Sequence, residues 1–494
     1  MELRPRWSGP ASRSAGSALD TLRARLDASR SIFLEVDQVL AEQAAALERA
    51  KALLAMTVTS AAASGVLIDR RGVASPDPAR RPELGGAAVR EAAAGIRTAL
   101  ELAAAADRET ARRLSDLAAE VIAGCPAEPP PSRPSVTAEP SAVRTWWEGL
   151  TTAQRRWLIQ HEPDLVGRLD GVPVAARDQA NRLLLEAQQA ALLQRRAQLG
   201  AQPLSPWVRR ELARLDGALA GLAAVAARLD TETGPRSYLL SLDPAGDGRA
   251  IVAIGNPDRA DNVLTYVPGM GSGLSRVEGE LKRVSRMVQR CVEVGPTEQT
   301  AAVLWLDYDA PDFLHEAYRD SFAHRAGPAL HRFQEGLLAT HDGPAAHRTV
   351  LGHSYGSLVV GATARDHGLA ADNLVFVGSP GVGVERAGDL GVPADQVWST
   401  TARNDIIQYA APTGDQALKR LWSHRSLPGL GPLVAFLTPH EELWFGHNPS
   451  HPGFGGQVFD GSPRGHAGYW DRNNPALDSM ARIILGGHHQ PALR

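Results

Sequence analysis

One serine of the chain lies between two glycines, in the sequence Gly352-His353-Ser354-Tyr355-Gly356. The apolar run before it is typical of a buried strand, and residues 358–367 are typical of a helix. A sharp strand-to-helix turn of this kind exposes a serine hydroxyl, and small residues must flank it. The turn also places the Tyr355 N–H at a helix N-terminus, where it can stabilise an oxyanion. The motif alone is weak evidence, because the chain holds 47 glycines.

A serine nucleophile needs a base, and the base needs an orienting carboxylate. A serine held in such a strand-to-helix turn is said to lie in a nucleophile elbow. In proteins with this elbow, the orienting carboxylate follows a later strand of the same sheet. Residues 397–402 are typical of such a strand, and Asp405 comes directly after it. We therefore predict Asp405 as the acid. Asp389 and Asp395 precede the strand and Asp415 lies in a later turn, which makes them weaker candidates.

The base is expected in the loop before the last helix. A short strand at 457–459 and a helix at 475–485 enclose His466, which we predict as the base. The chain has 15 histidines, so other candidates must be weighed. Four of them lie in the long loop region 413–456 that precedes His466: His424, His440, His447 and His451.

No metal site and no cofactor are expected. His447 and His451 are separated by Pro449, which excludes a regular helical pair, and we see no matching cysteine or carboxylate pattern. The favoured interpretation of the segment from His447 to His451 is a solvated loop. The two cysteines, Cys125 and Cys291, are far apart in the sequence, which argues against a disulfide framework or a cysteine-based metal site.

The oxyanion needs a second N–H donor from the loop that follows an earlier strand. Pro268-Gly269-Met270-Gly271 follows the apolar strand 262–267. We predict the Met270 amide as this donor, with Gly271 as the second choice. The predicted oxyanion hole thus consists of Tyr355 and Met270.

These residues must be positioned by a common scaffold. From residue 237 the hydrophobic pattern becomes strand-like, with a hairpin first and then strands alternating with helices. This order predicts an α/β fold with a mostly parallel sheet and helices on both faces. Ligands bind at the carboxyl ends of strands in such sheets. The glycine-rich and polar stretches at 268–273, 307–309, 352–356 and 378–381 all follow strands, which strengthens the catalytic interpretation of Ser354.

The chain before residue 236 is predicted to be all helical. Apolar residues repeat at helical spacing over 17–60 and 87–123, which predicts a helical hairpin within residues 1–123. Prolines mark a linker at 124–142. We expect a helical segment at 143–235, packing on a catalytic domain at 236–494. The sequence Thr151-x-x-Gln154 predicts a helix-capping box.

Composition limits the partners. A net charge of −3 gives no basic excess for nucleic acid. We find no run of 18 apolar residues and no ordinary secretory signal, so we expect a cytoplasmic protein without a transmembrane span, with non-classical export as the alternative. The expected ligand is a small-molecule or lipid-like acyl substrate. Residues 17–123 are candidates for self-association or for binding a protein partner.

In combination, these motifs resemble an actinobacterial alpha/beta-hydrolase family formerly catalogued as a domain of unknown function. The resemblance covers roughly residues 143–487 and implies the alpha/beta-hydrolase fold and a serine hydrolase, without a substrate. It rests on Trp146-Trp147, Leu169-Asp170-Gly171-Val172-Pro173, Arg177, Asn181-Arg182, Val267-Pro268-Gly269-Met270-Gly271, Gly352-His353-Ser354-Tyr355-Gly356-Ser357, Gly378-Ser379-Pro380-Gly381, His466 and Tyr469-Trp470.

Two hypotheses follow from the sequence. The first is a serine hydrolase that cleaves an ester or related acyl bond through Ser354, His466 and Asp405, or an acyltransferase with the same triad. The second is a non-enzymatic interaction protein in which the N-terminal helices carry the function.

The stretch 413–456 is typical of a long irregular loop. Its aromatic residues are expected either to form an apolar acyl-binding wall or to pack in the ordinary way.

Overall fold

The computed structural model describes residues 10–78, 85–123, 127–231, 234–405, 407, 442–462 and 465–486. The chain divides into two compact units. One unit consists of Met1–Arg133 and Trp147–Leu165, and the other of Pro134–Trp146 and Val166–Arg494. Helices α3 (Pro140–Gly149) and α5 (Pro163–Arg168) lie where the chain passes between the units.

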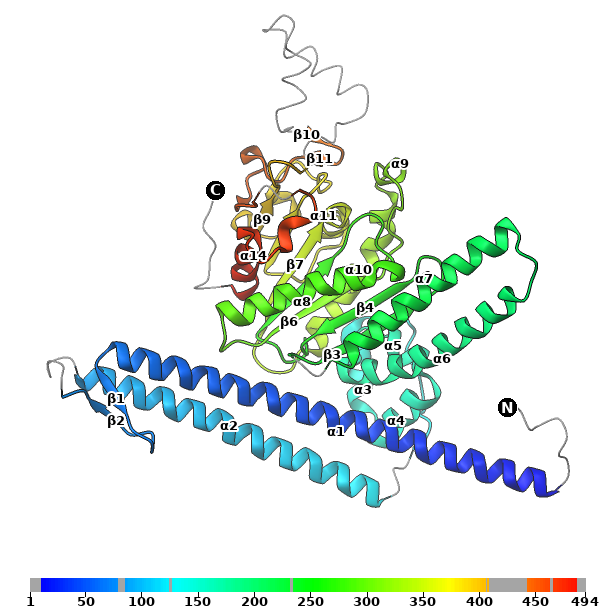
Figure 1. Cartoon of the computed structure of the whole chain (residues 1–494), viewed down its shortest axis with the longest axis horizontal. Helices are drawn as coiled ribbons and strands as arrows, with labels where there is room; N and C mark the ends of the chain where they lie inside the picture. The colour runs from blue at the N-terminus through cyan, green and yellow to red at the C-terminus, as the bar shows by residue number, and fades with distance from the viewer. Residues whose placement is uncertain are drawn as a thin grey trace, which may run out of the picture. The chain divides into compact units, whose positions relative to one another are not determined.

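The first unit is built on two long helices, α1 (Pro10–Ala63) and α2 (Gly85–Ile122), which lie side by side as a hairpin (Figure 1). The turn region between them contains a short antiparallel pair, β1 (Val66–Ile68) and β2 (Ala74–Pro76), which the sequence did not predict. Small residues bring the helices together: a Cβ atom at Gly95 would lie 2.4 Å from Thr57 Oγ1. Two of the apolar residues within the range 17–60 of the predicted helix, Leu40 and Leu54, are exposed.

A third helix of this unit, α4 (Thr152–His161), begins with the capping box that the sequence predicts. Thr151 Oγ1 accepts from the Gln154 N–H at 3.2 Å, and Gln154 Oε1 accepts from the Thr151 N–H at 3.0 Å. The buried Arg156 of α4 pairs with Glu120 of α2. This pair ties the short helix to the long one.

In the second unit, helix α6 (Val174–Gly200) is held against the sheet edge by buried polar side chains. Arg177 Nε donates to Leu240 O at 3.1 Å, and Asn181 Nδ2 donates to Leu239 O at 3.1 Å. Asp178 accepts from the Leu239 N–H at 2.8 Å, and burial raises its pKa to about 6. Arg177 and Asn181 therefore have structural roles. Helix α7 (Pro206–Leu229) follows and packs on the same unit.

Among the described residues, the sheet of this unit has eight strands in the order β12-β9-β8-β7-β5-β6-β4-β3. Their bounds in chain order are β3 Ser237–Asp243, β4 Arg249–Ile254, β5 Asn262–Val267, β6 Thr300–Leu306, β7 His347–His353, β8 Asn373–Val377, β9 Val397–Thr400 and β12 Gln457–Val458. Strands β3 and β4 form the predicted hairpin, and β4 also pairs antiparallel with β6. The other neighbours are parallel, as the alternation of strands and helices predicts.

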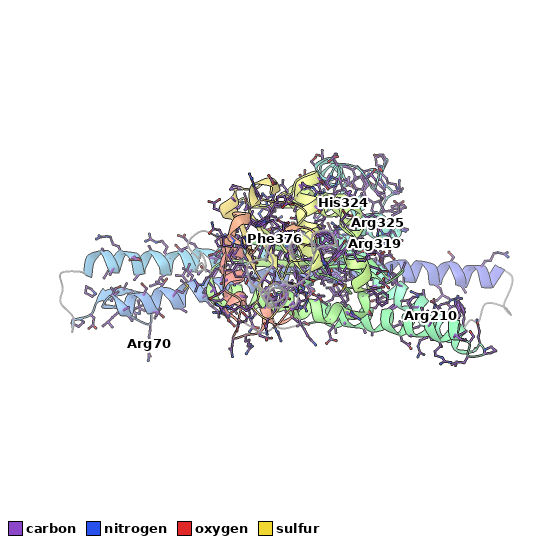
Figure 2. The ribbon with its side chains drawn as sticks, turned by 90° about the horizontal axis from the view of Figure 1, so that it is seen from above. Arg70, Arg210, Arg319, His324, Arg325 and Phe376 are labelled. Atoms are coloured by element: carbon purple, nitrogen blue, oxygen red, sulfur yellow. The ribbon has the colours of Figure 1, made fainter. Side chains whose placement is uncertain are left out.

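Helices cover both faces of this sheet (Figure 1). On one face lie α7, α8 (Val277–Val294) and α14 (Pro475–Leu485). On the other lie α10 (Ser321–Thr340) and α11 (Tyr355–His367). Figure 2 labels Phe376, a fully buried residue of β8, and His324 and Arg325, which are exposed on α10.

The remaining short elements are α9 (Leu314–Ala317), η2 (Leu274–Arg276), η3 (Ala387–Leu390), η4 (Ala394–Gln396), η6 (Pro452–Phe454), η7 (Gly468–Trp470) and the antiparallel pair β10 (Glu442–Leu443) and β11 (Gly446–His447). In the described part of the chain, every helix is too short or too polar to cross a membrane.

Candidate active site

Ser354 occupies the turn between the end of β7 and the start of α11. Its backbone has φ 54° and ψ −126°, and within the described residues it is the one non-glycine residue with positive φ. Its N–H donates to Val377 O on β8 at 2.9 Å, which holds the turn in this conformation. A strained serine between a strand and a helix is the geometry of a nucleophile elbow.

The glycines around Ser354 are required by contact distances. A Cβ atom at Gly356 would lie 2.2 Å from Val267 O, and one at Gly352 would lie 2.6 Å from Gly356 O. Both contacts are with backbone atoms, so no side-chain movement relieves them. The tight turn predicted from the motif is thus enforced by close approach of β5, β7 and α11.

The loop after β5 packs directly against the serine. A Cβ atom at Gly269 would lie 2.7 Å from Ser354 Cβ. Tyr308 Oη donates to Pro268 O at 2.6 Å, and the Gly271 N–H donates to Pro311 O at 2.8 Å, so both ends of the loop are fixed. Met270 lies between them with its side chain exposed. Because the Gly271 N–H is already bonded, Met270 stays the better prediction for the second oxyanion donor.

Asp405 and His466 lie within hydrogen-bond distance of each other. His466 Nδ1 is 2.9 Å from Asp405 Oδ1 and 2.9 Å from Oδ2. A carboxylate only accepts, so Nδ1 carries the proton, and in the neutral ring Nε2 keeps its lone pair. Asp405 is fully buried, and His466 is partly exposed. A Cβ atom at Gly378 would lie 2.9 Å from Asp405 Oδ2, so this pair also requires a glycine beside it.

Tyr469 is part of this arrangement, although its role could not be predicted from the sequence. Its Oη donates to Asp405 Oδ2 at 2.5 Å and accepts from the Ala402 N–H at 2.9 Å. The Ile407 N–H donates to Asp405 Oδ1 at 2.9 Å. Burial and the neighbouring carboxylate raise the pKa of Tyr469, so it remains a donor. The one sequence feature that pointed to Tyr469 was its position in the Tyr469-Trp470 pair, close to His466. Its hydrogen bond with Asp405 could not be predicted, because the two residues are far apart in the sequence.

His353, the residue before the serine, is buried next to the predicted base. Its Nε2 lies 3.0 Å from His466 O and must donate, because a carbonyl only accepts. The two imidazole rings have centroids 4.8 Å apart. Desolvation, with the nearby His466 and Arg283 adding to it, lowers the pKa of His353 well below 6.5. His353 therefore supports the loop that carries His466 and stays neutral.

We expect the His353→Gln variant to lose less stability on acidification than the wild type. Below pH 6.5 the unfolded chain protonates His353 and the folded chain does not, so the free energy of unfolding falls as pH falls. The wild-type slope should exceed that of the variant by up to about 1.4 kcal/mol per pH unit. Urea denaturation at pH 7.5, 6.5 and 5.5 measures both slopes. Equal slopes would contradict the assignment.

The other candidates for the acid and the base are not joined to this site. Asp389 lies in η3 and Asp395 in η4, and both are exposed. His447 and His451 bond to each other, with Nε2 and Nδ1 3.2 Å apart. Asp415, His424 and His440 lie outside the described residues, as does the part of the predicted 413–456 loop before residue 442.

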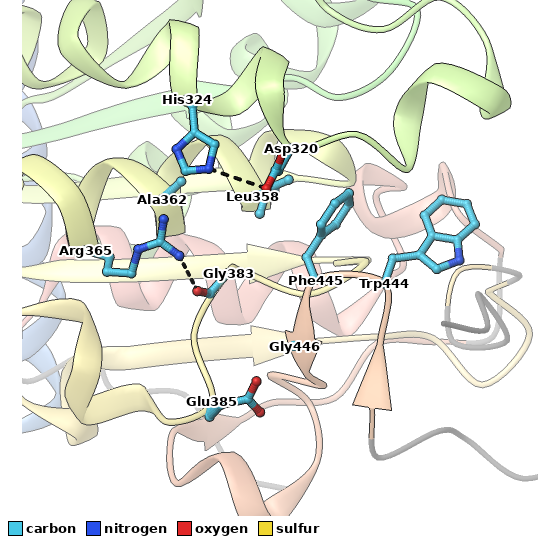
Figure 3. Close-up of a pocket in the computed structure, with 10 residues that line it drawn as sticks. All are labelled: Asp320, His324, Leu358, Ala362, Arg365, Gly383, Glu385, Trp444, Phe445 and Gly446. Atoms are coloured by element: carbon cyan, nitrogen blue, oxygen red, sulfur yellow. Dashed lines mark hydrogen bonds and ion pairs between the residues drawn. The ribbon is translucent and has the colours of Figure 1, made fainter. Parts of the chain in front are cut away.

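A cavity of about 250 Å³ lies along α11 on the side of the β10–β11 hairpin. Figure 3 shows its lining residues: Asp320, His324, Leu358, Ala362, Arg365, Gly383, Glu385, Trp444, Phe445 and Gly446. The predicted triad does not line it. Phe445 links the two regions, because its ring makes an edge contact with the ring of Tyr355 at 6.0 Å.

Comparisons with known proteins show the family of this chain. A family model described as alpha/beta hydrolase matches residues 243–414, a range that contains Ser354 and Asp405 but ends before His466. An uncharacterized protein of Mycobacterium tuberculosis is 31% identical over 388 residues, which cover 73% of this chain and 58% of that protein. The chain therefore spans somewhat more than half the length of this relative.

Two further matches were found. A hyperthermophilic esterase from the archaeon Pyrobaculum calidifontis has a TM-score of 0.31 at 14% identity, covering 57% of this chain and 97% of that one. An uncharacterized protein of Mycobacterium bovis is 32% identical over 189 residues, which cover 36% of this chain and 70% of that protein. On the strength of this relative and the matching family model, the chain belongs to the alpha/beta hydrolase family, with mycobacterial and hence actinobacterial relatives.

Proposed function

We propose that this alpha/beta hydrolase is a serine hydrolase that cleaves an ester or a related acyl bond. The observation that carries the proposal is the hydrogen bond between His466 Nδ1 and the buried Asp405. Ser354 supports it, because within the described residues it is the one non-glycine residue with a positive φ. A nucleophile in an elbow, a base and an orienting acid make up the machinery of acyl transfer. Family membership supports the broader statement that the protein is a hydrolase.

In the proposed reaction, Ser354 Oγ attacks the acyl carbon while His466 Nε2 takes its proton. The carbonyl oxygen becomes an oxyanion, which the Tyr355 and Met270 amides stabilise. His466 then donates the proton to the leaving alkoxide, and an acyl-enzyme on Ser354 remains. Water attacks the acyl carbon of the acyl-enzyme while His466 takes a proton from that water. His466 then returns the proton to Ser354 Oγ as the bond from that oxygen to the acyl carbon breaks, and the acid product is released. Asp405 keeps His466 in the required tautomer throughout.

Apolar side chains near the elbow support a proposal for the substrate class. The Met270 side chain is exposed next to it, and Phe445 and Phe322 contact the ring of Tyr355. Apolar side chains around a polar reaction centre are typical of small-molecule sites. We therefore propose a small-molecule or lipid-like acyl substrate. An alcohol in place of water would turn the same steps into acyl transfer.

The decisive experiment uses a fluorophosphonate probe, which reacts covalently with activated serines. The wild-type chain should be labelled, and Ser354→Ala should not be. Ser357→Ala is the matched control, because Ser357 is a buried serine of the same turn whose Oγ donates to Gly352 O at 3.0 Å. That variant should still be labelled.

An unlabelled wild type would overturn the enzyme proposal and favour the non-enzymatic alternative, in which the N-terminal helices carry the function. Equal labelling of the wild type and Ser354→Ala would show that another serine reacts. Product analysis with a simple ester, in the presence and absence of added alcohol, separates hydrolysis from acyl transfer.

A further inference from the structure

Two glutamates and a histidine converge beside the β10–β11 hairpin. Glu442 and His447 are directly paired across this hairpin, and Glu385 reaches it from the chain after β8. One donor atom from each side chain lies within 4.8 Å of the other two. Figure 3 shows Glu385 with its carboxylate turned toward the hairpin that carries Phe445 and Gly446. A carboxylate partner for His447 could not be predicted from the sequence, because neither glutamate stands at a ligand spacing from it.

The hydrogen bonds outside this cluster fix the proton of His447. The Gly453 N–H donates to His451 Nδ1 at 3.2 Å, so His451 Nδ1 is an acceptor. His447 Nε2 lies 3.2 Å from the same atom and must therefore donate to it. In the neutral His447 ring, Nδ1 then carries a lone pair. The Nδ1 atom lies 3.4 Å from Glu442 Oε1, so these two atoms face each other across the hairpin.

The positions of these donor atoms fit a metal ion between them. Bonds of 2.0–2.2 Å from zinc to nitrogen and oxygen place two ligands of a tetrahedron about 3.4 Å apart. The separation of His447 Nδ1 from Glu442 Oε1 has this value. A ligating histidine also normally donates its other N–H to an outer partner, as His447 does to His451.

We propose that Glu385, Glu442 and His447 bind a divalent transition-metal ion, with Zn²⁺ as the preferred occupant. The mixed imidazole and carboxylate set favours such an ion over Ca²⁺ or Mg²⁺, and Zn²⁺ binds such sites more tightly than Mn²⁺ or Fe²⁺. Glu385 and Gly446 also line the cavity of about 250 Å³, which leaves room for a water ligand.

The ion would connect the β10–β11 hairpin to the segment after β8 that contains Glu385. The Gly383 N–H donates to Phe445 O at 2.8 Å, and the Phe445 N–H donates to Pro380 O at 3.2 Å. Glu385 lies two residues beyond Gly383, so a bond from the ion to Glu385 would extend this connection. Phe445 contacts Tyr355, whose amide is a predicted oxyanion donor. Any effect of the ion on the elbow would therefore be indirect, through this contact.

His324 offers a matched control within the same chain. It also lies between two carboxylates, Asp320 at 3.5 Å and Asp366 at 3.2 Å. There, however, each carboxylate faces a different ring nitrogen, so the three side chains do not converge on one point. Substitution of His324 should leave metal binding unchanged.

The test is Zn²⁺ binding to the full chain after treatment with a chelator, measured by calorimetry and by elemental analysis. We expect about one Zn²⁺ per wild-type chain, and a Tm raised by at least about 3 °C at saturation. Glu385→Gln and Glu442→Gln keep the side-chain shape and should weaken binding at least about tenfold. His324→Asn should bind as the wild type does.

Absence of stoichiometric Zn²⁺ uptake by the wild type would overturn the proposal and leave His447 as a protonated partner of the glutamates. Unchanged affinity in both glutamine variants would also overturn it, because the bound metal would then belong to other histidines. A larger Tm response to Ca²⁺ than to Zn²⁺ would refute the choice of ion. These readouts do not depend on hydrolase activity, so they stand apart from the test of Ser354.

Discussion

Replacing Asp405 by asparagine is expected to lower kcat for a p-nitrophenyl ester by about four orders of magnitude. The Asp405 carboxylate accepts hydrogen bonds from His466 Nδ1, Tyr469 Oη and the Ile407 N–H. Asparagine has one oxygen, and its NH₂ group would meet a donor. If the NH₂ faces His466, Nδ1 must become the acceptor and the proton moves to Nε2. His466 could then no longer take the proton of Ser354.

The matched comparison is Tyr469→Phe, which removes one of the three donors and leaves the carboxylate in place. A hydrogen bond to a charged group contributes about 1.5–3 kcal/mol, so we expect a loss in kcat of at least about tenfold with little change in KM. Steady-state kinetics of both variants, with circular dichroism to check the fold, provide the measurement. An Asp405→Asn variant that retains a tenth of wild-type kcat would exclude Asp405 from the proposed triad.

The second large effect is expected from Gly356→Ala. The new Cβ atom would lie 2.2 Å from Val267 O and 2.7 Å from Pro268 O. Both are backbone atoms, so the start of α11 must move away from the end of β5. We expect the free energy of unfolding to fall by about 3 kcal/mol. Fluorophosphonate labelling should slow by about a hundredfold or more, because Ser354 would move relative to the Met270 loop.

Gly279→Ala provides the control for this substitution. Gly279 is an exposed residue within α8, and a Cβ atom added there would meet nothing within 4 Å. Alanine is the better helix former, so the variant should gain about 0.8 kcal/mol and keep the wild-type labelling rate. Urea denaturation and labelling time courses compare the three proteins. Wild-type stability and labelling in Gly356→Ala would contradict the steric account of the elbow.

Local patterns predicted the elements of the sheet closely. The bounds of β5 and α14 agree with the predicted ranges because each is a short apolar segment between clear turn residues. The order of the strands could not be predicted in the same way. β5 pairs with β7 on one side and β6 on the other, and this choice depends on contacts between residues far apart in sequence.

The candidate site shows the same division. The positions of Asp405 and His466 after particular strands were predictable, and the two side chains do meet. The contact of Tyr469 with Asp405 and that of Glu442 with His447 were not, because each is formed by side chains that converge only in the folded chain. The helical spacing of apolar residues did not identify the whole contact face of α1, since small residues such as Thr57 on α1 and Gly95 on α2 also approach each other closely.

The pairing of β9 with β12 has a consequence for how this protein can diversify. Trp398 pairs with Gln457 and Ser399 with Val458, so the two strands are neighbours although the chain between Thr400 and Gln457 is long. Asp405 lies near the start of this stretch, and His466 follows β12. The cost of closing a loop grows only slowly with its length. Sequence after Asp405 and before β12 can therefore be exchanged, shortened or extended while the proposed acid and base stay together, which would let related chains change substrate and keep one chemistry.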